Sequence, residues 1–139
     1  MTLHTGSCRC GAIRFEADAD PFYTGYCHCS DCRRATGAPM AAFVGFRTEH
    51  ARFSGETPST YGTAPVSRSF CGTCGAPIAY FDARLPDQIF MMLGAMDEPK
   101  NYAPTVHGYI SSALPFLHLD DDLPRMETNT VPRPQGASR

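Results

Sequence analysis

Three cysteines fall within six consecutive residues of this chain, at Cys27, Cys29 and Cys32. Thiolate sulfur is both a metal ligand and a nucleophile in proteins, and cysteines two or three positions apart can reach the same ion. Zinc enzymes commonly hold the metal through three protein ligands and leave its fourth position to water or substrate. The segment therefore predicts an open zinc site that would deprotonate a bound thiol and so create a nucleophile at neutral pH.

The other four cysteines form two pairs. Cys8 and Cys10 form a C-x-C motif, and Cys71 and Cys74 form a C-x-x-C motif with glycines at 72 and 75. Glycine allows the backbone to fold around a metal, and four thiolates make a closed zinc site with no vacant position. We expect this site to be structural. The alternative, a thioredoxin-like redox motif at Cys71 and Cys74, lacks the preceding βαβ pattern.

Charged and titratable side chains adjoin the three-cysteine segment. In an extended turn the side chain between two cysteines faces the other way, so we expect His28 to lie behind the metal ligands or to relay protons. A packed or solvated histidine is the alternative. Arg33 and Arg34 follow Cys32 directly, and either would offset surplus negative charge or bind an anionic substrate, a role assigned first to Arg33. The alternative is two solvated arginines on a helix face.

The overall composition limits the classes of function. The chain has 139 residues, 42% of them hydrophobic, and a formal net charge of −2. These values predict one globular domain and no global positive field for binding nucleic acid. The sequence offers no secretory signal and no apolar run of membrane-spanning length, so we expect a cytoplasmic protein that does not bind membranes. In a reducing compartment, clustered cysteines are more often metal ligands than disulfides.

Twelve glycines and twelve prolines divide the chain into short segments and favour β structure. A short helix is expected at 30–36, with Ser30 as its N-cap and Gly37 as its terminator. The Asp120–Asp122 run is expected to be a solvated acidic turn. Strands are expected at 12–18, 22–26, 40–46, 59–61, 66–70, 77–81, 88–93 and 106–110, and one helical turn is expected at 97–102. The sequence predicts a zinc-binding domain over residues 1–127 and a flexible, proline-rich tail over 128–139.

Three motifs in this order and spacing resemble those of the glutathione-dependent formaldehyde-activating enzyme (GFA) family. They are S-C-R-C-G at 7–11, C-H-C-x-x-C-R-x-x-x-G at 27–37 and F-C-G-x-C-G at 70–75. The resemblance extends over roughly residues 3 to 126. It implies a mainly β, Mss4-like fold, in which small antiparallel sheets and one or two short helices surround two zinc positions.

The resemblance also implies an activity and a division of the ligands. Motif matching assigns Cys8, Cys10, Cys71 and Cys74 to a structural zinc, and Cys27, Cys29 and Cys32 to a catalytic zinc, giving two zinc ions per chain. The family's named reaction is that of a carbon–sulfur lyase, in which glutathione adds to formaldehyde to give S-hydroxymethylglutathione. Small-molecule thiol and aldehyde partners follow, in a monomer or a homodimer. A non-catalytic, zinc-stabilised binding module and an iron–sulfur protein remain as alternatives.

Overall fold

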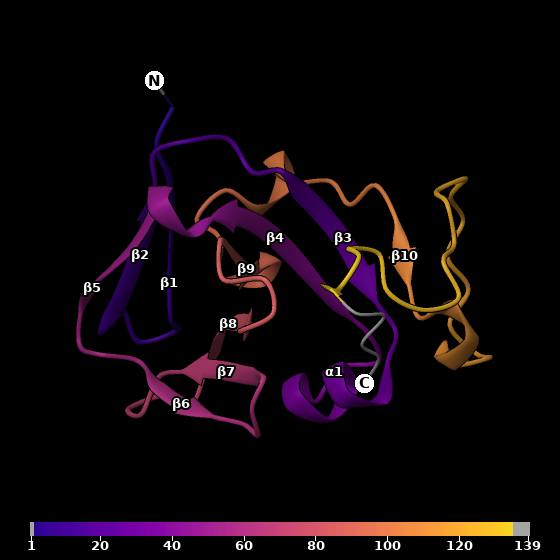
Figure 1. Ribbon diagram of the computed structural model, residues 1–139, viewed down its shortest axis with the longest axis horizontal. Coiled ribbons are helices and arrows are strands. Elements are labelled where there is room, and N and C mark those ends of the chain that lie inside the picture. The colour runs from indigo at the N-terminus through magenta and orange to yellow at the C-terminus, as the bar shows by residue number, and fades with distance from the viewer. Residues whose placement is uncertain (1, 135–139) are drawn as a thin grey trace.

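Two β-sheets and one short α-helix make up the structure, a computed structural model that describes residues 2–134 (Figure 1). The smaller sheet has the strand order β1-β2-β5, and the larger has the order β10-β3-β4-β9-β8-β7-β6. The strands of the smaller sheet are β1 (His4–Ser7), β2 (Ile13–Ala17) and β5 (Ala51–Gly55). Those of the larger are β3 (Tyr23–Cys27), β4 (Ala41–Arg47), β6 (Ser59–Tyr61), β7 (Val66–Phe70), β8 (Pro77–Asp82), β9 (Gln88–Met92) and β10 (His107–Gly108).

The helical elements are short and lie at strand ends. The α-helix is α1 (Ser30–Thr36), and the 3-10 turns are η1 (Thr48–His50), η2 (Leu93–Ala95), η3 (Pro99–Asn101) and η4 (Ile110–Ser112). All strand pairs within the two sheets are antiparallel except β10 with β3, which is parallel. The predicted mainly β fold is therefore confirmed.

Strand β4 lies at the centre of the core. It pairs with β3 on one side and β9 on the other, and its apolar run is buried on both faces. Val44 and Phe46 are fully buried there, together with Ile13 of β2, Ile78 of β8 and Met91 of β9. A continuous apolar run is typical of such a central strand, so the prediction of a buried strand at 40–46 is confirmed within one residue at each end.

Helix α1 follows β3 after a two-residue turn and has the predicted length. Gly37 ends it in the left-handed region, with φ 73°, as the sequence predicts. The predicted N-cap is wrong by one residue. Cys29 is the N-cap, and its Sγ accepts a hydrogen bond from the amide of Cys32 at 3.2 Å. The N-cap hydrogen bond therefore fixes the relative positions of Cys29 and Cys32.

Strands β1 and β5 were not predicted from the sequence. Strand β1 has no apolar alternation, because its one buried residue is Gly6, which lies so close to Phe15 that a Cβ atom would overlap the ring. Strand β5 follows the turn η1 and pairs with β2 through all five of its residues. The strand expected at 106–110 is reduced to the two residues of β10, because residue 109 has a positive φ of 54° and ends it.

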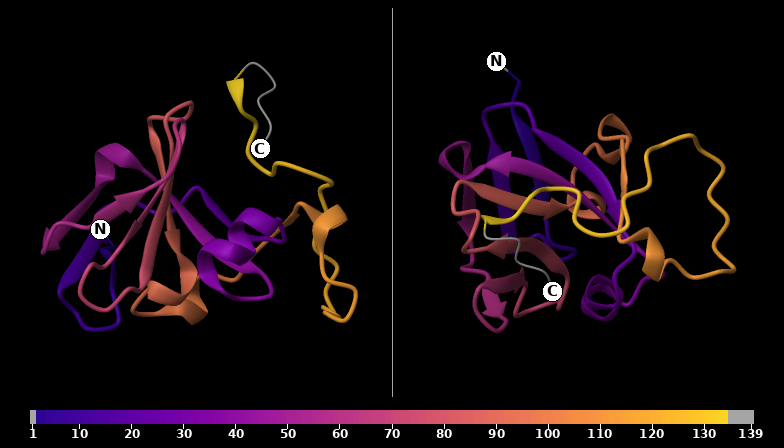
Figure 2. Two further views of the ribbon diagram at one scale, coloured as in Figure 1. Left: turned by 90° about the horizontal axis from the view of Figure 1, so that it is seen from below. Right: turned by 45° about the vertical axis from the view of Figure 1, so that its right-hand side comes forward.

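The chain beyond η4 makes a long excursion and then returns to the larger sheet (Figure 2). The amide of His107 donates to the carbonyl of Pro124 at 2.9 Å, which marks the point of return, and the amide of Tyr109 donates to the carbonyl of Thr128 at 3.0 Å. Of the tail expected at 128–139, residues 135–139 lie outside the described part of the chain, and residues 128–134 make the contacts given below. Among the helices at positions 2–134, none has the length and apolar character of a membrane span.

We expect Phe46→Ala to lower the free energy of unfolding by about 3–5 kcal/mol, because the large side chain leaves a cavity in a core that relaxes only partly. Phe46 is 1% exposed, whereas Phe116 is 70% exposed and supplies a matched control. Phe116→Ala should change the free energy by no more than about 0.5 kcal/mol. Urea denaturation followed by circular dichroism measures both. Equal effects of the two substitutions would contradict this description of the core.

Candidate metal centres

Four cysteines meet where the two sheets join. Cys8 and Cys10 lie in the turn between β1 and β2, and Cys71 and Cys74 lie in the turn between β7 and β8. Their four Sγ atoms lie within 4.8 Å of one another, with Cys8–Cys10 at 3.6 Å and Cys10–Cys71 at 3.8 Å. A tetrahedral zinc with Zn–S bonds of about 2.3 Å requires sulfur atoms about 3.8 Å apart. The cluster therefore has the spacing and the donor chemistry of a closed metal site.

The two turns of this four-cysteine cluster use similar backbone contacts. The amide of Ile13 donates to Cys8 Sγ at 3.3 Å, and the amide of Cys74 donates to Cys71 Sγ at 3.4 Å. Each turn also contains a glycine with positive φ, Gly11 at 84° and Gly75 at 78°. Amides directed at sulfur favour the thiolate form. The hydrogen bond from Ile13 lowers the pKa of Cys8, and the one from Ala76 lowers the pKa of Cys74 to about 6.

The other three cysteines, the trio Cys27, Cys29 and Cys32, meet at the end of β3 and the start of α1. Their Sγ atoms also lie within 4.8 Å of one another, and Cys32 Sγ is 3.3 Å from Cys27 Sγ. Cys29 and Cys32 are buried, and Cys27 is half-buried. All seven cysteines lie in the described part of the chain, and none forms a disulfide. The structure thus brings together both predicted sets of ligands.

The short distances between the three sulfur atoms disfavour loss of the thiol protons when no cation is bound. The thiols of Cys29 and Cys32, together with burial, raise the pKa of Cys27 far above its ordinary value. Three thiolates at these distances would repel one another in a poorly solvated site. A divalent cation would offset that repulsion, so the donor set fits a metal with three protein ligands.

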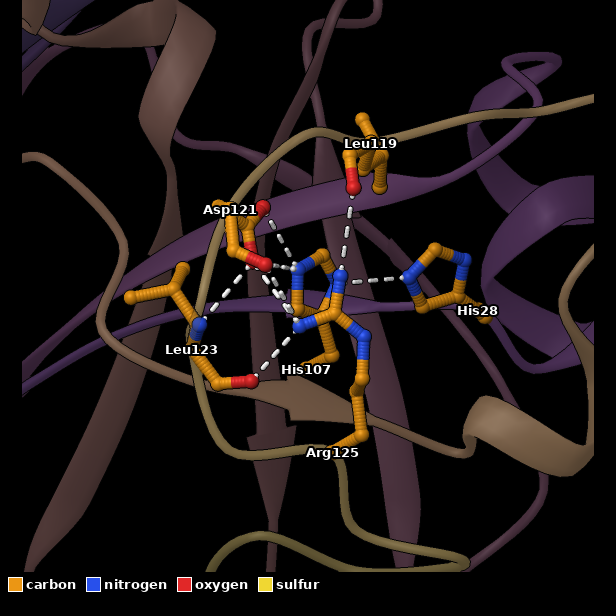
Figure 3. A network of polar contacts seen from close by, with 6 residues as sticks. All are labelled: His28, His107, Leu119, Asp121, Leu123 and Arg125. Atoms are coloured by element: carbon orange, nitrogen blue, oxygen red, sulfur yellow. Dashed lines mark hydrogen bonds and ion pairs between the residues drawn. The ribbon is translucent and has the colours of Figure 1, made fainter.

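His28 belongs to a hydrogen-bonded chain with His107, Asp121 and Arg125 (Figure 3). His28 Nε2 is 2.9 Å from Nδ1 of His107, whose Nε2 lies 3.1 Å from a carboxylate oxygen of Asp121. Arg125 in turn donates to Asp121 at 2.9 Å. Both histidines are no more than 1% exposed. His28 thus bonds to His107 and is not part of the three-cysteine set, and Asp121 of the chain comes from the run expected to be a solvated turn.

Asp121 is the acceptor at one end of this chain. Although burial opposes its charge, hydrogen bonds from His107, Leu123 and Arg125 lower the pKa of Asp121, so its carboxylate accepts from His107 Nε2. The hydrogen bond between His107 Nδ1 and His28 Nε2 continues the chain at 2.9 Å, and burial lowers the pKa of His28, which favours its neutral ring. His28 Nδ1 is buried and has no hydrogen-bond partner among the described residues.

A narrow cavity of about 50 Å³ adjoins Cys27 and Cys32. We call it the aromatic pocket, because its walls include the rings of Tyr23, Phe43, Tyr80, Phe90 and Tyr109. The ring of Phe90 packs edge-on against both Tyr23 and Tyr80. The remaining wall comes from Gly108, residues 129–131 and Arg133. An apolar space thus lies directly beside two sulfur atoms of the trio.

An open groove of about 820 Å³ adjoins the third cysteine, Cys29, between α1 and the β6–β7 hairpin. We call it the arginine groove, because Arg34, Arg68 and Arg84 line it. Arg68 donates to Asp31 at 2.7 Å and lies 3.5 Å from Cys32 Sγ. Although burial opposes its charge, Asp31 and Cys32 raise the pKa of Arg68. Its guanidinium is thereby held in the charged form beside the trio.

The two arginines that follow Cys32 have different surroundings. Arg33 is half-buried, and its NH1 donates to the carbonyls of His28 at 2.6 Å and Ser112 at 2.7 Å. Those contacts tie the trio's turn to η4. Arg34 is exposed on α1, lines the arginine groove, and forms no ion pair with any residue in 2–134.

The chain is similar to known proteins in both sequence and fold. The model of the glutathione-dependent formaldehyde-activating enzyme family matches residues 3–112. A Halomonas elongata protein that carries the provisional name of such an enzyme is 32% identical over 104 residues, 68% of this chain and 66% of that protein, so the match spans just under two thirds of the relative. A Rhodobacter sphaeroides crystal structure from a structural genomics programme has a TM-score of 0.54 at 25% identity, covering 67% of this chain and 87% of that chain.

We expect serine substitutions to separate the two cysteine sets. Cys71→Ser should remove about one equivalent of metal and unfold the protein, because the binding energy of a structural zinc is on the order of 10 kcal/mol. Cys29→Ser should also remove about one equivalent but keep the fold, since serine is itself a good N-cap for α1. Elemental analysis and thermal unfolding measure the two effects. A folded Cys71→Ser protein with wild-type metal content would contradict the structural assignment.

Proposed function

The chain belongs to the glutathione-dependent formaldehyde-activating enzyme family, and we propose that it adds a thiol such as glutathione to formaldehyde or a related small aldehyde. The reaction is that of a carbon–sulfur lyase acting in the direction of bond formation, and zinc is the metal at both cysteine sets. We place the protein in the cytoplasm, where its cysteine thiols would stay reduced.

One observation carries this proposal: the trio is shared between two cavities of opposite character. Cys27 and Cys32 line the narrow aromatic pocket, and Cys29 lines the arginine groove. A reaction between a small carbonyl compound and a larger anionic thiol needs two such approaches to one reactive centre. The pocket suits the carbonyl compound by size, and the groove suits the thiol by charge.

The groove offers a cation for the carboxylates of a peptide thiol. Arg68 is bound to Asp31, and Arg84 shares the carboxylate of Asp82 with Arg133, so both groove arginines are already held by protein carboxylates. Arg34 is the groove arginine that forms no ion pair within 2–134. The role predicted for Arg33 in binding an anionic substrate therefore passes, in our proposal, to Arg34, while Arg33 fixes the turn of the trio.

The chemistry requires one bond to form and one proton to move. The thiol sulfur attacks the carbonyl carbon, a C–S bond forms, the C=O π bond breaks, and the proton that leaves sulfur ends on the new hydroxyl oxygen. A zinc ion on Cys27, Cys29 and Cys32 would supply a lower pKa for the attacking thiol. The protein's part is to hold the three sulfur ligands, to orient the two substrates, and to keep water out of the aromatic pocket.

Purified protein loaded with zinc tests the proposal directly. Exchange NMR of glutathione with formaldehyde measures the rate of S-hydroxymethylglutathione formation above the spontaneous rate. We expect acceleration by wild-type protein and none by Cys29→Ser, which keeps the fold but lacks one ligand. Wild-type protein that contains two zinc ions and neither binds glutathione nor accelerates the reaction would overturn the proposal and favour a non-catalytic binding module.

We expect Arg34→Gln to raise KM for glutathione by roughly 5- to 50-fold while leaving kcat nearly unchanged, because an ion pair to a remote carboxylate acts on binding alone. KM for uncharged 2-mercaptoethanol should not change. Arg14→Gln is the matched control, since Arg14 is an exposed arginine on β2, in the smaller sheet. Steady-state kinetics with both thiols provides the measurement. An equal effect of Arg34→Gln on both thiols would exclude charge recognition by this residue.

A further inference from the structure

The segment of residues 128–134, which we call the strap, lies beyond the residues that the family model matches, 3–112. It nevertheless forms one wall of the aromatic pocket, through Asn129, Thr130, Val131 and Arg133. Val131 packs with the buried cluster that contains Phe43, Phe90 and Cys32. A part of this chain that lies outside the family pattern therefore closes the space next to two trio sulfurs.

Three tyrosines hold the strap in place by their hydroxyl groups. The hydroxyl of Tyr23 is 2.7 Å from Thr130 Oγ1, and that of Tyr109 donates to Asn129 Oδ1 at 3.0 Å. The hydroxyl of Tyr80 accepts from Arg133 at 3.1 Å. These three tyrosines also line the aromatic pocket. Each tyrosine thus contributes both to the wall of the pocket and to the attachment of the strap.

A buried ion pair anchors the end of the strap. Arg133 Nε donates to Asp82 Oδ2 at 3.1 Å, and the Asp82 side chain is fully buried while that of Arg133 is 9% exposed. Arg84 binds the same carboxylate, and its hydrogen bonds, helped by those of Arg133, lower the pKa of Asp82 to about 2. A charge-assisted contact with so little solvent access is a firm attachment.

Close contact between the strap and β10 depends on Gly108. A Cβ atom at this position would lie 2.8 Å from Cγ2 of Thr130, closer than side chains normally approach. A Cβ atom at Gly94, by contrast, would meet nothing within 4 Å. An alanine at Gly108 would therefore force the Thr130 side chain to shift and would disturb its contact with the Tyr23 hydroxyl, whereas the same change at Gly94 would not.

We propose that the strap is the element that selects the carbonyl substrate, by limiting the aromatic pocket to an aldehyde of one or two carbons. The inference rests on the proposed function. A cavity of about 50 Å³ has room for only a few groups the size of a water molecule. A longer alkyl chain that stays within the pocket must displace Val131 or the rings opposite it. Each methylene that an apolar pocket accepts or refuses changes relative rates by roughly 10- to 200-fold.

Two substitutions test this inference in the zinc-loaded enzyme, with glutathione as the thiol. Val131→Ala enlarges the pocket, and Gly108→Ala forces Thr130 of the strap to shift, while Gly94→Ala is the matched control. Relative kcat/KM for formaldehyde and butanal is the readout. We expect wild-type protein and the control to favour formaldehyde, and both strap variants to reduce that preference by at least about 10-fold. An unchanged preference in both strap variants would overturn the inference while leaving the proposed function standing.

A binding measurement separates this inference from the proposed function. Acetamide and butyramide are inert carbonyl compounds of two lengths, and saturation-transfer NMR detects their binding without any thiol or turnover. We expect wild-type protein to bind acetamide but not butyramide, and Val131→Ala and Gly108→Ala to bind both. Zinc content and circular dichroism confirm that each variant is folded. Binding of butyramide by wild-type protein would overturn the inference, whether or not the protein accelerates adduct formation.

Discussion

Crowding of sulfur atoms is the constraint on which the remainder of the structure depends. Four thiols from two distant turns lie within 4.8 Å of one another at the junction of the sheets, and three more lie within the same distance at the end of β3. Neither set can ionise fully without a cation among its members, because like charges this close repel one another strongly. A bound metal would convert that repulsion into the link that joins the smaller sheet to the larger one.

The sequence predicted those features that depend on local pattern. Motif spacing identified both sets of cysteines, and the apolar run at 40–46 identified the central strand β4. Features that depend on packing between distant segments were not predictable. Gly6 in β1 is buried because it adjoins Phe15, not because it is apolar. Asp121 belongs to an acidic run that reads as a solvated turn, and only the return of the chain after η4 brings it against the buried His107.

In the candidate site, too, the local pattern was predictable from the sequence and the contacts between distant segments were not. The types and spacing of Cys27, Cys29 and Cys32 indicated an open set of ligands, but nothing nearby in the sequence indicated the two cavities that the trio adjoins. The aromatic pocket takes its walls from five strands, α1 and the strap, and the arginine groove takes Arg68 and Arg84 from segments far from α1 in sequence. An arginine in a strand carries no sequence signal of what it faces. Such residues become apparent only in three dimensions.

The strap and the sulfur ligands lie in different parts of the chain, so the wall of the aromatic pocket and the metal ligands are encoded separately. Every cysteine lies before residue 75, whereas Asn129, Thr130, Val131 and Arg133 follow the last cysteine by more than fifty residues. The terminal segment can therefore be exchanged, lengthened or redesigned without altering any sulfur ligand. If the proposed function holds, changes to a few strap residues would alter the carbonyl substrate while the seven cysteines stay as they are.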